Sequence, residues 1–135
     1  MKLLLDTCVF NEKEFLSTLQ KQDSSEVQLF INSIIYLELG YIYFIRQKWA
    51  LFTKILNDLK IKTESISKVI AERAIKAAVY FKDTDQGASY YFRDCLIGAT
   101  AELLDCMLIT KNLDDFGWLQ KEKCLTPEQL LKRLD

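Results

Sequence analysis

The pattern of hydrophobic and polar positions divides the chain into short strands that alternate with longer helices. The first strand is expected at residues 3–5, an apolar run that ends at Asp6. Further strands are expected at residues 27–31, 61–66 and 107–110, with a weak one at 124–125. Because the clearest strands are apolar along their whole length, they predict a parallel sheet covered by helices on both faces.

Apolar residues at helical spacing fill the segments between these strands. This spacing predicts helices at residues 11–21, 33–47, 48–59, 67–81 and 94–105. Ser67 is a suitable cap for the fourth helix, and Pro127 stands at the favoured first position of a last helix. Another helix is expected to open at Asn112, and residues 82–89 form the clear polar loop. The whole chain, 1–135, is expected to be a single domain.

Composition narrows the possible chemistry through the absence of histidine. Without histidine the chain has no Ser-His-Asp triad, no imidazole base and no histidine-ligated metal site. The net charge of −1 argues mildly against a nucleic-acid partner, although a local basic patch would suffice for one. Acid/base or metal chemistry is therefore expected to fall to carboxylates.

The cysteines and the apolar runs indicate in which cellular compartment the protein is expected. Cys8, Cys95, Cys106 and Cys124 show no zinc-like spacing, and we interpret them as reduced thiols of a cytoplasmic protein. A structural disulfide is the other interpretation. No apolar run approaches the roughly 18 residues of a membrane span, so no membrane association is expected.

Four acidic residues stand at informative positions, and each also has an ordinary structural explanation. Asp6 follows the first strand, where it would serve in a turn. Glu38 shares a helix face with three isoleucines, but it would equally be the one solvated position of a helix that is apolar all round. Asp94 would cap its helix, and Asp115 would complete a capping box with Asn112.

The combination of these acids favours a metal site. In a parallel sheet, ligands bind beyond the carboxyl ends of the strands, where Asp6 and Asp115 are expected to meet. Two carboxylates about 4 Å apart repel by roughly 4 kcal/mol at an effective dielectric constant of 20. A hard divalent cation with oxygen ligands, Mg²⁺ or Mn²⁺, relieves this repulsion. Such an ion without a histidine base suits the hydrolysis of phosphate esters.

Four segments of the chain resemble the PIN-domain nucleases, in particular the VapC-type toxins of prokaryotic toxin–antitoxin pairs. The opening LLLDT at residues 3–7 is similar to the strand and Asp-Thr start of that family. The segments SIIYLELGY at 33–41 and DCLIGATA at 94–101 resemble those that carry its second and third acids. The segment TKNLDDF at 110–116 resembles its T-x-N-x-x-D-F ending, which places the fourth acid at Asp115 rather than Asp114.

The resemblance implies a fold, an activity and a set of site residues. The fold would be an α/β/α sandwich of three layers around a five-stranded parallel sheet. The activity would be Mg²⁺- or Mn²⁺-dependent endoribonuclease cleavage by in-line attack of activated water, leaving a 5′-phosphate and a 3′-hydroxyl. Asp6 and Asp94 would be the principal metal ligands, completed by Glu38 and Asp115. The substrate-binding or supporting residues would be Thr7, Arg93, Thr110 and Asn112.

Several questions stay open at the level of the sequence. Arg93, directly before Asp94, would either pair with that acid or grip a phosphate. Six aromatic residues between Tyr36 and Phe52 exceed what one core face needs, which suggests a homodimer interface or a groove for an antitoxin. The alternatives in function are a catalytically silent PIN-like module that binds RNA or protein, and an RNA-processing nuclease outside toxin–antitoxin systems.

Overall fold

A parallel sheet of five strands forms the centre of the molecule. The computed structural model describes residues 1–134, and its strands lie in the order β3-β2-β1-β4-β5. All neighbouring strands pair in parallel. The strand bounds are β1 (Lys2–Leu5), β2 (Gln28–Asn32), β3 (Lys62–Glu64), β4 (Met107–Ile109) and β5 (Cys124–Leu125).

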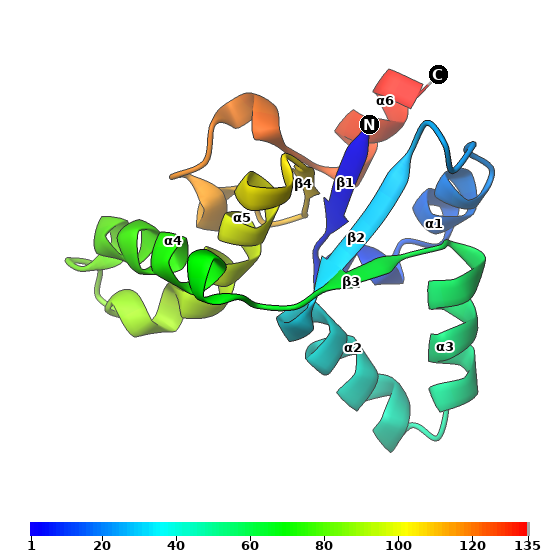
Figure 1. Ribbon diagram of the computed structural model, residues 1–135, viewed down its shortest axis with the longest axis horizontal. Coiled ribbons are helices and arrows are strands. Elements are labelled where there is room, and N and C mark those ends of the chain that lie inside the picture. Colours follow the sequence, from blue (N-terminus) through cyan, green and yellow to red (C-terminus); the bar gives the residue numbers. More distant parts are fainter. Residues whose placement is uncertain (135) are drawn as a thin grey trace.

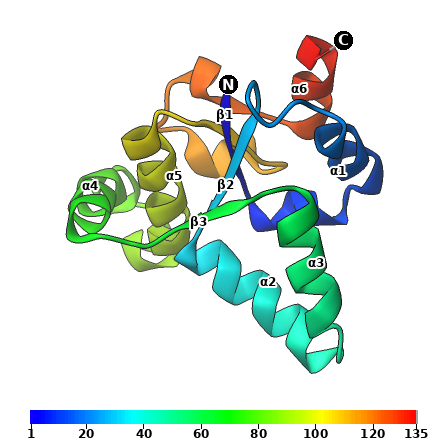
Figure 2. The ribbon, with the colours of Figure 1, turned by 45° about the vertical axis from the view of Figure 1, so that its right-hand side comes forward.

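Helices cover both faces of this sheet. Their bounds are α1 (Lys13–Gln20), α2 (Ser33–Ile45), α3 (Trp49–Asp58), α4 (Lys68–Ala78), α5 (Phe92–Leu104) and α6 (Pro127–Leu134). Figures 1 and 2 show α4 and α5 on one side of the sheet and α1, α3 and α6 on the other. Helix α2 leaves the carboxyl end of β2 and extends away from the sheet. The expected α/β/α architecture is confirmed.

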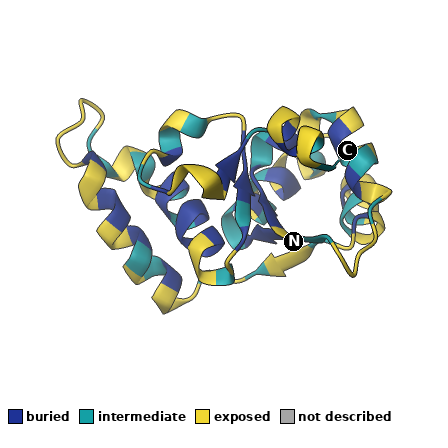
Figure 3. Ribbon diagram, turned by 90° about the horizontal axis from the view of Figure 1, so that it is seen from above, coloured by how far each residue is buried: buried dark blue, intermediate teal, exposed yellow. Residues whose placement is uncertain are grey.

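The core lies on both faces of the central strands. Leu3, Leu4 and Leu5 are completely buried, which explains why β1 is apolar at every position rather than alternating. A second apolar cluster joins α4 to α5, where small side chains such as Ala74 and Ala99 let the two helices lie close together. Figure 3 shows this burial as dark blue ribbon in the sheet and along the facing sides of the helices.

Most predicted elements are present, with shifts at their ends. The hydroxyl oxygen of Ser67 accepts a hydrogen bond from the amide of Ile70 at 3.2 Å, so its predicted capping role is confirmed. Pro127 begins α6 as predicted. Strand β3 is shorter than expected, and Lys62 and Thr63 are exposed because this strand forms the edge of the sheet.

Two predictions about helix starts are wrong. Helix α5 begins at Phe92, so Asp94 is its third residue and not its cap. The segment after Asn112 forms only a short 3₁₀ turn over Leu113–Phe116, and the Asn112 side chain makes no capping hydrogen bond there. Asp94 and Asp115 therefore stand inside these two elements, and neither has the capping role that the sequence pattern suggested.

The structure shows the state of the cysteines and the lengths of the helices, which concern the predictions about disulfides and membranes. The four cysteines are free thiols, and burial raises the pKa of Cys95, Cys106 and Cys124 to about 11. Across residues 1–134, every helix is too short or too polar to cross a lipid bilayer.

Candidate acidic site at the carboxyl edge of the sheet

Asp6 is the most deeply buried acid of the site, and its carboxylate is held on both sides. The register of β1 and β4 brings it beside Thr110, because its amide donates to the carbonyl of Ile109 at 3.0 Å. Its Oδ1 accepts a hydrogen bond from the amide of Thr7 at 2.7 Å, and its Oδ2 accepts one from the hydroxyl of Thr110 at 2.8 Å. Only 1% of Asp6 is exposed, and these hydrogen bonds compensate for the burial of its charge.

Glu38 is brought to this edge by the start of α2. The side chain of Asn32, the last residue of β2, accepts a hydrogen bond from the amide of Ile35 at 3.0 Å and so caps the helix. The amide group of Asn32 also donates to the hydroxyl of Thr100 in α5 at 3.0 Å, which ties the two helices together. Glu38 then lies in the second turn of α2, where its Oε1 accepts a hydrogen bond from the Thr7 hydroxyl at 2.6 Å.

The helix face that carries Glu38 is not the core face that the isoleucine spacing suggested. Ile42 and Ile45 on that face are exposed, while Ile35 and Leu39 point into the core. Glu38 is therefore partly solvated, with 32% of its side chain exposed, and it is also paired with a cation. Leu37 and Tyr41 are more exposed, at 65% and 63%, so the interpretation of Glu38 as the one solvated position of this helix is wrong.

Asp94 lies on the first turn of α5 with 13% of its side chain exposed. Burial raises the pKa of this carboxyl to about 6, against the opposing charge of Arg93. The negative charges of Asp115 and Asp6 contribute to this rise in the pKa of Asp94. Asp115 acts on Asp94 from a different element, the short 3₁₀ turn over Leu113–Phe116.

Arg93 lies at the point where three acids converge. Its Nε donates to Glu38 at 2.6 Å, its Nη1 to Asp94 at 2.5 Å and its Nη2 to Asp6 at 2.9 Å. Burial alone would lower the pKa of Arg93, but its contacts with Glu38 and Asp6 raise it above the usual value. The guanidinium therefore stays charged and balances the acids around it.

Apart from Asp115, the predicted site residues are linked to one another by hydrogen bonds. Direct hydrogen bonds link Asp6, Thr7, Glu38, Arg93, Asp94 and Thr110. Asn112 joins them through its backbone amide, which donates to the Thr110 hydroxyl oxygen at 3.1 Å. Arg93 pairs with Asp94, one of the two options that the sequence left open, and with two further acids that sequence reasoning missed.

Three other residues of the site were not predicted. Cys8 lies beside Asp6, with its Sγ 3.8 Å from Oδ2. Asn32 had a usable signal, because an asparagine between a strand and a helical run is a typical cap. Thr100 had none, since its partner Asn32 lies 68 residues away in the sequence.

The donor set suits a hard divalent cation. All the acidic ligands present oxygen atoms, and three of them already converge on a single positive group. Within residues 1–134, no three acidic or cysteine side chains form a group that is gathered around a common metal position. The carboxylates therefore fit such an ion by the chemistry of their oxygens, while their point of convergence is taken by the Arg93 guanidinium.

Comparison with known proteins gives matches in family and in fold. The family model described as PIN domain matches residues 3–118. A toxin–antitoxin complex from Klebsiella pneumoniae has 24% identity and a TM-score of 0.71, covering 93% of this chain and 97% of that one. VapBC2 from Rickettsia felis, bound to a promoter DNA fragment, has 18% identity and a TM-score of 0.62, with coverages of 93% and 97%.

A third solved structure and the curated proteins complete the comparison. FitAcB from Neisseria gonorrhoeae has 18% identity and a TM-score of 0.64, covering 93% of this chain and 98% of that one. No curated protein matches the sequence. At these identities the solved structures support a shared fold over nearly the full length of both chains.

Proposed function

Because the chain belongs to the PIN-domain family, whose members are nucleases, we propose that it is a Mg²⁺- or Mn²⁺-dependent endoribonuclease. The observation that carries this proposal is the convergence of Asp6, Glu38 and Asp94 on one cationic group at the carboxyl edge of the sheet. That edge is where parallel α/β sheets bind their ligands. The single domain 1–135 would contain the whole site.

Asp6 and Asp94 would be the principal ligands of the ion, and Glu38 and Asp115 would complete the acidic cluster. When bound, such an ion lowers the pKa of a water molecule and offsets negative charge on a phosphodiester. Asp6 is suited to this role because Thr7 and Thr110 fix both of its oxygens. A ligand held in one orientation does not have to reorganise when it binds.

The remaining polar residues of the site support the acids through hydrogen bonds. Thr7 orients Asp6 through its amide and Glu38 through its hydroxyl, so one residue couples two acids. Asn112 holds the Thr110 hydroxyl, which in turn holds Asp6. We propose that Thr7, Arg93, Thr110 and Asn112 support the site or contact the RNA backbone.

Metal removal tests the proposed activity. The purified chain is expected to cleave RNA in the presence of Mn²⁺ or Mg²⁺ and to lose at least about a hundredfold in rate in EDTA, because the ion supplies several kcal/mol of transition-state stabilisation. Excess Mn²⁺ should restore the rate, and the products should carry a 5′-phosphate.

Two results would contradict the proposed activity in different ways. Cleavage that is insensitive to EDTA would indicate a contaminating ribonuclease or a metal-independent mechanism. RNA binding without any cleavage under all metal conditions would indicate the silent binding module instead. Electrophoresis of an end-labelled RNA together with a binding assay separates these outcomes.

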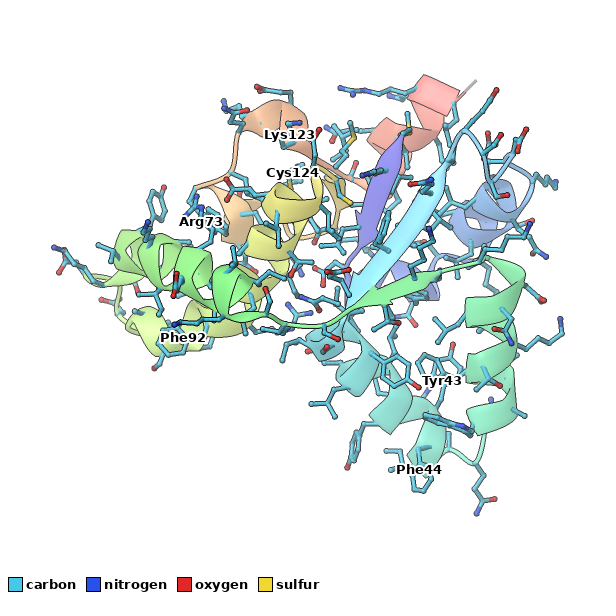
Figure 4. The ribbon with its side chains drawn as sticks, in the orientation of Figure 1. Tyr43, Phe44, Arg73, Phe92, Lys123 and Cys124 are labelled. Carbon is cyan, nitrogen blue, oxygen red and sulfur yellow. The ribbon has the colours of Figure 1, made fainter. Side chains whose placement is uncertain are left out.

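We further propose that this nuclease is a cytoplasmic toxin that forms a homodimer and is held by a cognate antitoxin. The support for association with a second copy or an antitoxin is an apolar surface, which we call the α2 surface. Its side chains are between 41% and 69% exposed: Leu37, Tyr41, Phe44, Ile45 and Trp49. Part of the aromatic cluster is core, since Phe52 is 1% exposed and stacks on Tyr43. Figure 4 shows Phe44 at the far end of α2, away from the sheet.

The α2 surface is expected to mediate self-association. Phe44→Glu should shift the mass measured by light scattering from dimer to monomer, because a charge in an apolar interface has to be desolvated. The fold should be unaffected, since Phe44 is 69% exposed.

Tyr90→Glu is the matched control for this test. Tyr90 is 64% exposed but lies before α5, outside the α2 surface, so its replacement should leave the mass unchanged. A monomeric mass for the unaltered chain would contradict the dimer.

A small gene beside this one that encodes a DNA-binding protein would favour the toxin over an RNA-processing nuclease.

A further inference from the structure

Arg93 donates hydrogen bonds from all three of its guanidinium nitrogens to the acids of the candidate site. Three of its nitrogens each donate to a different carboxylate, those of Asp6, Glu38 and Asp94. Its Nη2 also lies 3.2 Å from the Thr7 hydroxyl oxygen. Charge-assisted hydrogen bonds of this kind are stronger than neutral ones, and the planar fork of arginine spreads one charge over several acceptors.

The carboxylate oxygens at this position are almost fully engaged. Within residues 1–134, five of the six oxygens of Asp6, Glu38 and Asp94 accept hydrogen bonds, and three of the five accept from Arg93. A divalent cation bound by these acids would need some of the same oxygens. While Arg93 stays in place, the ion would also lie a few ångströms from its positive charge, where repulsion between cations is strong.

We propose that Arg93 is a built-in counter-cation that competes with the divalent ion for these oxygens, so that the ion binds only when the Arg93 side chain moves out of the site. This inference rests on the proposed metal-dependent function. The arginine would keep the acids apart and neutralised until an ion displaces it, which sets a threshold concentration for loading the site. Competition of this kind lowers the apparent affinity by the fraction of molecules in which the site is open.

The surroundings of Arg93 allow such a movement. Its side chain is 35% exposed, compared with 32% for Glu38, 13% for Asp94 and 1% for Asp6, so the arginine is the most exposed of the four. It stands in the first turn of α5, next to Phe92, which is 52% exposed. Rotation about the side-chain torsions of Arg93 would release all three acids without moving the backbone that carries Asp94.

Calorimetric titration of Mn²⁺ into EDTA-stripped and dialysed protein tests the competition. Arg93→Gln is expected to bind the ion at least about tenfold more tightly than the unaltered chain, because the closed state is removed. Arg93→Lys should be intermediate, since an ammonium is a compact charge that cannot pair with three carboxylates at once. The matched control is Arg73→Gln: Arg73 is similarly exposed at 38% and pairs with Glu102, outside the site.

A second measurement follows Arg93 directly in the unaltered chain. The Nε–H resonance of Arg93 in ¹⁵N-edited NMR spectra should shift, and its exchange with solvent should become faster, as Mg²⁺ is added. An arginine that only supports the fold would keep its hydrogen bonds and its resonance. This readout also decides the question if Arg93→Gln fails to fold.

The outcomes separate this inference from the proposed function. If the unaltered chain binds Mn²⁺ and Arg93→Gln binds it no more tightly, the competition is refuted while the metal-dependent function stands. The competition is also refuted if Arg73→Gln tightens binding equally, because the change in net charge then accounts for the effect. If no variant takes up metal, both the inference and the metal-dependent function fail.

Discussion

Asp94→Asn is expected to lower the rate of RNA cleavage at least about a hundredfold and, at the same time, to stabilise the folded protein. The rate falls because one of the two principal ligands of the ion loses its charge. The stability rises because Asp94 is 13% exposed and stands among like charges, so its ionised form is unfavourable in the folded state. Asparagine keeps the shape of the side chain and carries no charge to bury.

The stabilisation from Asp94→Asn should depend on pH. The pKa of Asp94 is raised from 3.8 to about 6 on folding, so the carboxyl is neutral in both states at pH values below about 4. Above pH 6 it is charged in both states, and the folded state bears the cost. Urea unfolding in EDTA should therefore show a gain of about 1–3 kcal/mol at pH 8 that shrinks toward zero near pH 4.

Asp83→Asn is the matched control for this variant. Asp83 is an exposed acid in the polar loop after α4, so the same chemical change there should alter neither cleavage nor stability. Full activity of Asp94→Asn would refute the role of Asp94 as a metal ligand. A loss of stability at pH 8 would instead refute the cost that we assign to burying its charge.

The parts of the site that could be predicted from the sequence are those set by strand ends. Asp6 and Thr110 follow the apolar strands β1 and β4, and parallel strands bring such residues to one edge whatever the details of the loops. Local patterns were less reliable. Asp94 looked like a helix cap, but α5 begins at Phe92, directly after a 3₁₀ helix that ends at Tyr91.

The role of Arg93 illustrates what the sequence could not show. Its adjacency to Asp94 suggested a local pair, whereas Glu38 and Asp6 lie 55 and 87 residues away. No spacing rule connects positions so far apart, and only the packing of α5 against β1 and of α2 against α5 makes them neighbours. The exposed face of α2 was misread for a related reason, because apolar residues at helical spacing do not tell whether a core or another surface covers them.

Asp6→Asn is expected to lower cleavage as strongly as Asp94→Asn but to destabilise the fold. Both oxygens of Asp6 face donors: the Thr7 amide and Arg93 on one side, and the Thr110 hydroxyl on the other. An amide group placed toward Thr7 would set N–H against N–H. Unfolding free energy should therefore fall by about 1–3 kcal/mol, the usual cost of leaving a buried group without its partner.

Replacement by asparagine is expected to stabilise the chain at Asp94 and to destabilise it at Asp6. Comparing the two variants therefore tests whether hydrogen bonds hold Asp6 in place. An amide placed toward Thr110 would remove the oxygen that accepts hydrogen bonds from the Thr110 hydroxyl and the Cys8 thiol, so neither orientation satisfies every donor. Urea unfolding of both variants at pH 8 in EDTA, beside the Asp83→Asn control, measures the two signs. If Asp6→Asn stabilised the chain as Asp94→Asn should, repulsion among the acids would outweigh the hydrogen bonds that hold Asp6. Its position would then be set by the backbone of β1 rather than by Thr7 and Thr110.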